Sequence, residues 1–177
     1  HGNRRISRRV LGQQDAETIA DQFAGQKLNS PTDLVVRSDG TIYFTDPPYG
    51  IRPEEADLGF NGVYRLNPDG KLTLLVKDFD RPNGLAFSPD EKRLYIPNSW
   101  SDTVSEVDTG SLEAIRTLPA GSEPNATATD GAFLYVANRI SNDVSVIDLV
   151  TGKEDKRLLA GRGVAYLALS PDRKRIY

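Results

Sequence analysis

Polar residues follow proline at the same place in three similar segments of the chain. The segments are Pro31-Thr32-Asp33, Pro82-Asn83-Gly84 and Pro124-Asn125-Ala126. Each one leads into a short apolar run that is typical of a β-strand. Oxygen atoms that converge from several strand starts suit a hard cation such as Ca²⁺, which takes about six to eight oxygen ligands. We therefore take Asp33, Asn83 and Asn125 as candidate metal ligands.

A second set of polar and aromatic residues follows the strands that come next. Together with Thr32 and Asp33 they are candidate substrate contacts: Asp46, Tyr49, Asn98, Trp100, Asn138 and Arg139. Trp100 and Tyr49 could form a stacking surface for a sugar or a small aromatic ring, although a loop tryptophan more commonly packs over a sheet edge. For Asp46, Asn98 and Asn138 we favour the alternative that Asp and Asn at strand ends stabilise turns.

Other catalytic arrangements find little support. The only histidine is His1 and there is no cysteine, so a nucleophilic triad would have to be built on the first residue. The glycine-rich run at residues 160–163 lacks the Lys-Ser/Thr pair of a phosphate-binding loop. No catalytic residue is assigned from the sequence.

The elements that must position these residues repeat along the chain. Each proline segment is followed by a turn and then by an apolar residue and a tyrosine, and Val164 to Leu169 begins a fourth, degenerate copy. The tyrosines, which are 52, 40 and 42 residues apart, are Tyr43, Tyr95, Tyr135 and Tyr177. Short strands at this spacing are the signature of four-stranded propeller blades. The longer first interval contains a loop insertion at residues 47–60.

We predict an all-β chain of about four blades that forms a single β-propeller. The expected divisions are a half-blade at residues 1–30, blades at 31–80, 81–121 and 122–161, and a half-blade at 162–177. Residues 16–23 also match a helical pattern, but the repeat favours a strand there. The two half-blades are complementary, and pairing them would remove open sheet edges.

Composition narrows the function classes. The chain has 177 residues, 38% of them hydrophobic, and a formal net charge of -3. We expect no nucleic-acid or membrane partner, because the charge is modest and no apolar run is long enough to span a bilayer. Four arginines near the start, at positions 4, 5, 8 and 9, fit a solvated outer strand. The absence of methionine, even at position 1, suggests a processed, excised or engineered piece. We expect a soluble chain without disulfides, and its compartment stays open.

Four strings in the first half are distinctive: His1-Gly2-Asn3-Arg4-Arg5, Leu28-Asn29-Ser30-Pro31-Thr32-Asp33, Tyr43-Phe44-Thr45-Asp46-Pro47-Pro48-Tyr49-Gly50 and Arg81-Pro82-Asn83-Gly84-Leu85. Through them, residues 1 to about 96 resemble the SMP-30/gluconolactonase/LRE-like family of six-bladed propellers. In the second half, Leu134-Tyr135-Val136-Ala137-Asn138 and the run at 142–148 resemble YVTN-type repeats. Such repeats usually belong to seven-bladed binding or scaffold proteins. We interpret the chain as a natural or built chimera joined near residues 94–96.

The first resemblance implies a divalent metal, often Ca²⁺, at the channel mouth and the hydrolysis of lactones or related esters. The family's ligands are a glutamate, two asparagines and an aspartate. Asn83 matches one asparagine, Thr32 stands at the other, and Asn125 stands at the aspartate. The glutamate belongs to a region without a counterpart here. One ligand in four is retained, so we expect weak metal binding or none.

Three functions stay open: a propeller scaffold without efficient catalysis, a residual Ca²⁺-dependent lactonase, and a module that binds a peptide or sugar. We also expect two chains to exchange terminal half-blades in an eight-bladed homodimer. Eight blades need a turn of about 45° per blade, whereas a four-bladed monomer needs about 90°. Close-packed blade interfaces tolerate the smaller adjustment better.

Overall fold

The computed structural model describes residues 3–177 and divides into two compact units, His1–Phe79 and Asp80–Tyr177. We call them the N-terminal and C-terminal units and describe each by itself. His1, which the sequence left as a candidate, lies outside the described residues. The predicted closure of all blades into a single ring stays a prediction.

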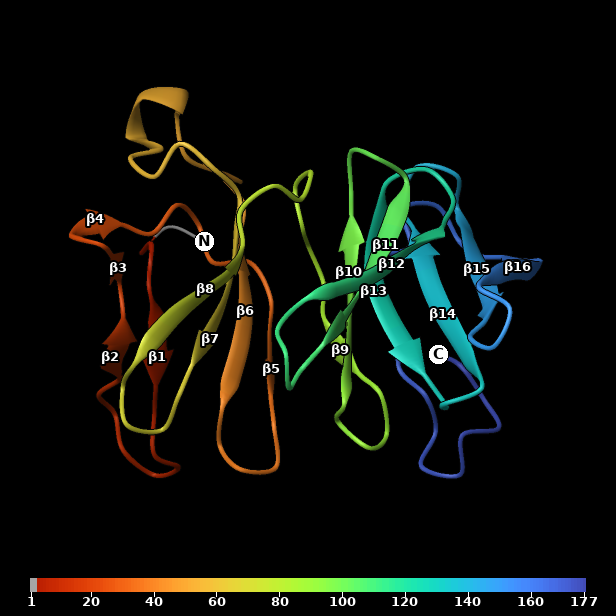
Figure 1. Ribbon diagram of the computed structural model, residues 1–177, viewed down its shortest axis with the longest axis horizontal. Coiled ribbons are helices and arrows are strands. Elements are labelled where there is room, and N and C mark those ends of the chain that lie inside the picture. Colours follow the sequence, from red (N-terminus) through yellow and green to blue (C-terminus); the bar gives the residue numbers. More distant parts are fainter. Residues whose placement is uncertain (1–2) are drawn as a thin grey trace. The chain divides into compact units, whose positions relative to one another are not determined.

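The N-terminal unit contains one complete blade and two hairpins (Figure 1). The blade is a four-stranded antiparallel sheet in chain order, made of β5 (Leu34–Val36), β6 (Ile42–Asp46), β7 (Gly62–Leu66) and β8 (Leu72–Val76). The hairpins pair β1 (Ile6–Arg8) with β2 (Glu17–Ala20), and β3 (Gln22–Phe23) with β4 (Gln26–Lys27). A short 3-10 helix, η1 (Pro53–Glu55), lies in the insertion between β6 and β7.

The segment with the helical pattern forms a strand, as the repeat predicts. β2 ends at Ala20, earlier than expected, and Phe23 belongs to the second hairpin. The turn of that hairpin has left-handed backbone at Ala24 and Gly25, with φ of 51° and 81°. Tight pairing of β3 with β4 needs such a turn, which the alignment with residues 75–79 does not reveal.

Alternation of side chains along the strands builds the core of the N-terminal unit. Phe44 and Tyr64 are opposite each other on β6 and β7, and their rings stack with centroids 5.1 Å apart. Ile6 of β1 and Leu28 are buried in the same apolar cluster. The β1–β2 hairpin therefore packs face to face on the complete blade. Tyr43 lies on the opposite face of β6 and lines a cavity there.

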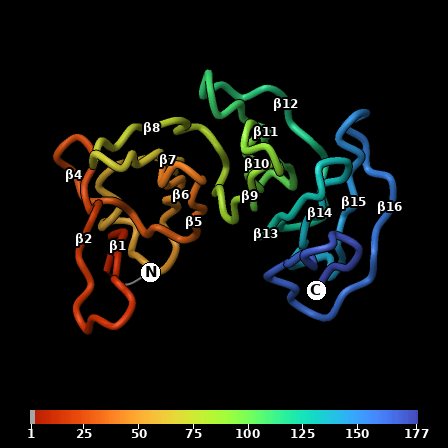
Figure 2. Tube along the Cα trace, turned by 90° about the horizontal axis from the view of Figure 1, so that it is seen from below, coloured from red at the N-terminus to blue at the C-terminus, as the bar shows by residue number. Residues whose placement is uncertain are grey.

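The C-terminal unit contains two complete blades. One has β9 (Ala86–Phe87), β10 (Arg93–Asn98), β11 (Thr103–Asp108) and β12 (Ala114–Pro119). The other has β13 (Pro124–Thr129), β14 (Phe133–Asn138), β15 (Asp143–Asp148) and β16 (Lys153–Leu159). β13 lies against both β9 and β10, as Figure 2 shows end-on. Residues 168 and 177 exchange two backbone hydrogen bonds and begin a further strand pair.

Four equivalent turns share one geometry. In each, the side chain of an aspartate accepts a hydrogen bond from the backbone N–H two residues later, and the residue between them is left-handed. The aspartates are Asp39, Asp90, Asp130 and Asp172. The left-handed residues are Gly40, Glu91, Gly131 and Arg173. The repeat read from the sequence therefore extends to backbone torsion angles, and the prediction of an all-β chain with about four blades is confirmed.

Candidate functional site

Two asparagine side chains are joined directly in the C-terminal unit. Nδ2 of Asn83 donates to Oδ1 of Asn125 at 2.6 Å, and the backbone N–H of Gly84 donates to the Asn125 carbonyl at 2.9 Å. Nδ2 of Asn125 in turn donates to the carbonyl of Ala165 at 2.7 Å. The starts of three successive repeats therefore meet through these amides, as their position after proline led us to expect. We call Asn83 and Asn125 the amide pair.

A serine that the sequence did not single out lies beside the amide pair. Ser99 is 3% exposed and follows Asn98 at the end of β10. Its hydroxyl donates to the carbonyl of Pro124 at 2.9 Å, and its Oγ lies 3.5 Å from Nδ2 of Asn83. Only the pairing of strand ends reveals this contact, because nothing in the local sequence distinguishes Ser99 from other loop serines.

Trp100 is the neighbouring aromatic residue of this unit, and 62% of its surface is exposed. The guanidinium carbon of Arg81 lies 3.6 Å from the centroid of its ring. The backbone N–H of Ser99 donates to the Arg81 carbonyl at 3.2 Å, which holds the loop of Trp100 next to the segment that carries Asn83. A stacked arginine and an exposed indole therefore flank the amide pair. Tyr49, the proposed stacking partner, belongs to the N-terminal unit and is half-buried.

Asn98 and Asn138 lie inside their own blades. Asn138 is fully buried; it donates to Oδ1 of Asp143 at 2.7 Å and to Oγ of Ser145 at 2.9 Å, and its Oδ1 accepts the Gly121 N–H. Asn98 likewise donates to Oγ of Ser105 at 2.9 Å. These bonds tie the second strand of each blade to the third. Both side chains thus link neighbouring strands of one blade, and whether they also contact a ligand stays a prediction.

Arg139 forms a surface ion pair. Its Nε donates to Oε1 of Glu123 at 2.7 Å, and about half of its side chain is exposed. Exposed pairs of this kind contribute little to stability, typically about 0–1 kcal/mol. Arg139 is therefore not oriented by a buried network as Asn138 is.

In the N-terminal unit, Thr32 and Asp33 extend the pairing of β5 with β6. The N–H of Thr32 donates to the Thr45 carbonyl at 3.0 Å, and the Thr45 N–H donates to the Asp33 carbonyl at 3.1 Å. Oδ1 of Asp33 accepts the N–H of Leu34 at 2.8 Å. The backbone of both candidates is thereby fixed beside the end of β6.

Asp46 ends β6 and is fully buried. Its Oδ2 accepts the backbone N–H of Asn29 at 2.8 Å, and its backbone oxygen accepts Nδ2 of Asn29 at 3.0 Å. Burial raises the pKa of Asp46 to about 6; hydrogen bonds from the backbone of Asn29 and Ser30 and the positive charge of Arg4 oppose this shift. The sequence pointed to Asp46, but not to its partner Asn29.

Four buried oxygen atoms around Asp46 lack a hydrogen-bond partner among the residues that the structure describes. They are Oδ1 of Asp46, Oδ1 of Asn29, Oγ of Ser30 and the hydroxyl of Tyr64. Gly62 is opposite Asp46 on β7, and the Tyr64 ring fills the space where a side chain at position 62 would lie, 2.2 Å from an ideal Cβ. Burial first, and then the charge of Asp46, raises the pKa of Tyr64. Asp46 thus belongs to a buried polar cluster rather than to an open surface.

The residues of the C-terminal unit do not fit a Ca²⁺ ion by themselves. The amide pair offers neutral oxygens, and Oδ1 of Asn125 already accepts a hydrogen bond from Asn83. Ca²⁺ prefers a set of six to eight oxygens that includes carboxylates. Within residues 3–177, no three His, Cys, Asp or Glu side chains gather closely enough to hold a metal ion. Asp33, the carboxylate proposed as a ligand, lies in the N-terminal unit.

Comparison with known proteins agrees with the family resemblance of the sequence motifs. Gluconolactonase of Zymomonas mobilis is 44% identical over 111 residues, which cover 56% of this chain and 30% of that protein. Lactonohydrolase oryL of Aspergillus oryzae is 34% identical over 88 residues, or 47% of this chain and 20% of that one. The solved structure of XC5397 from Xanthomonas campestris, described as a gluconolactonase, superposes with a TM-score of 0.81 at 29% identity. That match covers 98% of this chain and 61% of the other.

The chain therefore spans less than a third of the length of these two curated relatives. No helix among the described residues is both long and apolar enough to cross a membrane. The model of the SMP-30/Gluconolactonase/LRE-like region matches residues 3–177, on both sides of the predicted chimera junction. The resemblance of the second half to YVTN-type repeats stays a prediction. With both halves matched and the blades in place, the chain belongs to the SMP-30/gluconolactonase/LRE-like family.

Proposed function

We propose that this protein acts on a lactone or a related ester, and that the amide pair Asn83–Asn125 contacts the reacting ring. The observation that carries the proposal is the direct 2.6 Å hydrogen bond between two amides that open successive repeats. Membership in a family that includes gluconolactonases supports the substrate class. Two relatives that act on lactones by name lead to the same class.

The chemistry of the amide pair suits a neutral, oxygen-rich ligand. A carboxamide supplies both N–H donors and an oxygen acceptor, so it can hydrogen-bond to a lactone carbonyl as well as to hydroxyl groups. The bonds from Asn83 to Asn125 and from Asn125 to the Ala165 carbonyl fix the orientation of both amides before a ligand arrives. Such preorganisation lowers the cost of ordering on binding. The exposed face of Trp100 would cover an apolar sugar face.

A metal ion is not part of this proposal. When bound in the family, a divalent ion would polarise the lactone carbonyl. Asn83 is the family ligand that the C-terminal unit retains, and Asn125 stands where the family has an aspartate. No step is assigned to an ion. The role left for these residues is to bind the ring and to orient its carbonyl.

The test is acid release from glucono-δ-lactone at constant pH, compared with spontaneous hydrolysis in the same buffer. We expect a saturable rate above the spontaneous one. Asn83→Ala and Asn125→Ala should each lower kcat/KM about tenfold, the equivalent of one hydrogen bond. The exposed Gln13→Ala is the matched amide control and should leave the rate unchanged. Parallel assays with EDTA and with added Ca²⁺ would show whether the rate depends on a metal ion.

The competing proposal is a chimeric scaffold without efficient catalysis. It predicts a rate no higher than that of the buffer in all variants. A third proposal, a sugar-binding module, rests on the exposed Trp100 beside Arg81. It predicts binding of the ring without turnover, measured as quenching of the fluorescence of Trp100, the only tryptophan. The same set of variants therefore separates the three.

A further inference from the structure

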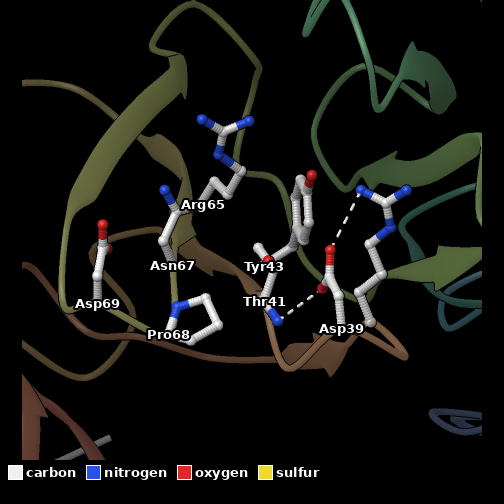
Figure 3. Close-up of a pocket in the computed structure, with 8 residues that line it drawn as sticks. Asp39, Thr41, Tyr43, Arg65, Asn67, Pro68 and Asp69 are labelled. Carbon is white, nitrogen blue, oxygen red and sulfur yellow. Dashed lines mark hydrogen bonds and ion pairs between the residues drawn. The ribbon is translucent and has the colours of Figure 1, made fainter.

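A polar cavity of about 440 Å³ lies on the complete blade of the N-terminal unit (Figure 3). Its lining includes Arg37, Asp39, Thr41, Tyr43, Arg65 and Asn67. Thr41 precedes β6, whereas Asp46 ends it, so the cavity is at the opposite end of this blade from Asp46. The volume is within the range of about 300–1,000 Å³ that is common for small-molecule sites.

Strand pairing places the two central residues of the cavity side by side. Tyr43 on β6 and Arg65 on β7 are direct cross-strand partners. They therefore share one face of the sheet, opposite to the face on which Phe44 and Tyr64 stack. Asn67 follows Arg65 by two residues and lies near it in Figure 3. The sheet itself thus fixes the position of the arginine.

Arg65 has no partner for its charge within residues 3–177. Its Nε is buried without a hydrogen-bond partner, and no ion pair involves its guanidinium. A guanidinium stays protonated and carries five N–H donors, so burying part of it without an acceptor is unfavourable. Such an arrangement is stable when an acceptor of negative charge arrives from outside the chain.

The two carboxylates in the lining have partners other than Arg65. Oδ1 of Asp39 accepts the Thr41 N–H at 2.9 Å, and its other oxygen lies 3.6 Å from a guanidinium nitrogen of Arg37. The hydrogen bonds from Thr41 lower the pKa of Asp39, so it stays charged and paired. Asp69 accepts the Lys71 N–H at 2.9 Å and lies beyond Asn67 and Pro68 in Figure 3. Neither group compensates Arg65.

We propose that this cavity is a binding site for a small oxyanion, a carboxylate or phosphate group, anchored by Arg65. The planar fork of a guanidinium matches two oxygens of either group and forms charge-assisted hydrogen bonds. The Asn67 amide adjoins this position as a further donor. A cation is disfavoured by Arg65, and an apolar ligand is disfavoured by the polar lining. The site shares no residue with the amide pair, so it does not depend on the proposed lactone chemistry.

The experiment titrates the full chain with inorganic phosphate and, separately, with acetate at constant ionic strength. NMR of the arginine side chains follows the Nε–H signal of Arg65. We expect a saturable shift with at least one of the two anions, and the anion that binds more tightly identifies the group. Arg65→Gln should abolish saturable binding, and Arg65→Lys should weaken it about tenfold, because lysine keeps the charge but loses the fork. Arg52→Gln, an exposed arginine of the same unit, is the matched control.

Circular dichroism and the dispersion of backbone signals verify that each variant is folded. If Arg65→Gln fails to fold, Asn67→Ala replaces it and should weaken binding severalfold. The proposal is overturned if neither anion shifts the Arg65 signal, if chloride produces the same shift, or if the shift survives in Arg65→Gln.

Discussion

Asn29 and Asp46 are tied by two hydrogen bonds across 17 positions of sequence, one from the Asn29 backbone N–H to Oδ2 and one from its Nδ2 to the Asp46 carbonyl. Nδ2 of Asn29 also donates to the Phe60 carbonyl at 2.8 Å. The segment that leads into β5 is thereby fixed to the end of β6. Because Thr32 and Asp33 follow this segment directly, Asp46 determines the position of two candidate site residues.

Replacing Asp46 by asparagine should remove a pH dependence of stability. Its pKa rises from 3.8 to about 6 on folding, because burial disfavours the charged form. The folded state therefore binds the proton more tightly, and the stabilisation is full below the unfolded value and is lost as the pH rises through about 6. A shift of about two units corresponds to about 3 kcal/mol. We expect Asp46→Asn to gain stability relative to the parent by up to about this amount between pH 4 and 7.

Urea unfolding at several pH values measures this difference. The amide oxygen of the introduced asparagine can still accept the Asn29 N–H, so the variant should remain folded. Asp69→Asn, in an exposed turn, is the matched control for the loss of one carboxylate. A curve for Asp46→Asn that is parallel to that of the parent would contradict the assignment.

Asn138→Ala should destabilise the chain by about 1–3 kcal/mol. The substitution leaves the Gly121 N–H and the Ser145 hydroxyl without their partner in a buried region, and burying unpaired polar groups costs about this much. Asn83→Ala should cost less, because Asn83 is only half-buried. Chemical denaturation of the two variants makes the comparison. Equal losses would show that burial does not separate structural asparagines from site asparagines.

The insertion at residues 47–60 should exchange its backbone hydrogens faster than Leu34–Val36. Only the last part of this loop is anchored by apolar side chains: Leu58 is 8% exposed and Phe60 packs against the core. Before Leu58, η1 buries no residue. Hydrogen exchange followed by mass spectrometry should therefore find residues 49–57 to be the least protected part. Slower exchange there than in β5 would refute this.

We predict a homodimer formed by exchange of terminal strands. Among residues 3–177, β1 pairs only with β2, and Ile176 forms an isolated β-bridge with Leu169. Unpaired strand edges favour association with another strand. Light scattering should give about twice the chain mass of 19.5 kDa. Deleting residues 1–23 should restore the monomer. A mass of one chain for the intact protein at micromolar concentration would rule out the exchange.

Strand positions could be read from the sequence because each blade repeats the same alternation. The repeat by itself places third strands at residues 103–108 and 143–148, which are the bounds of β11 and β15. Side-chain roles could not be read in this way. Asn83 precedes the first strand of its blade and Asn138 ends the second strand of its blade, and the residue type does not reveal that one faces another amide and the other is buried between strands. The sequence does not single out Arg65 either, because its lack of a partner depends on which residues lie across from it on the neighbouring strands.

The aspartate turns have a consequence for how the repeats can diverge. Each needs a left-handed residue after the aspartate, and two copies supply glycine while Glu91 and Arg173 adopt φ of 57° and 56°. A left-handed residue with a side chain carries a strain of roughly 1–2 kcal/mol. Replacing either Glu91 or Arg173 by glycine would therefore remove this strain and stabilise the fold. The aspartate, rather than the residue that follows it, determines the geometry of each turn. These turns could therefore be exchanged between blades.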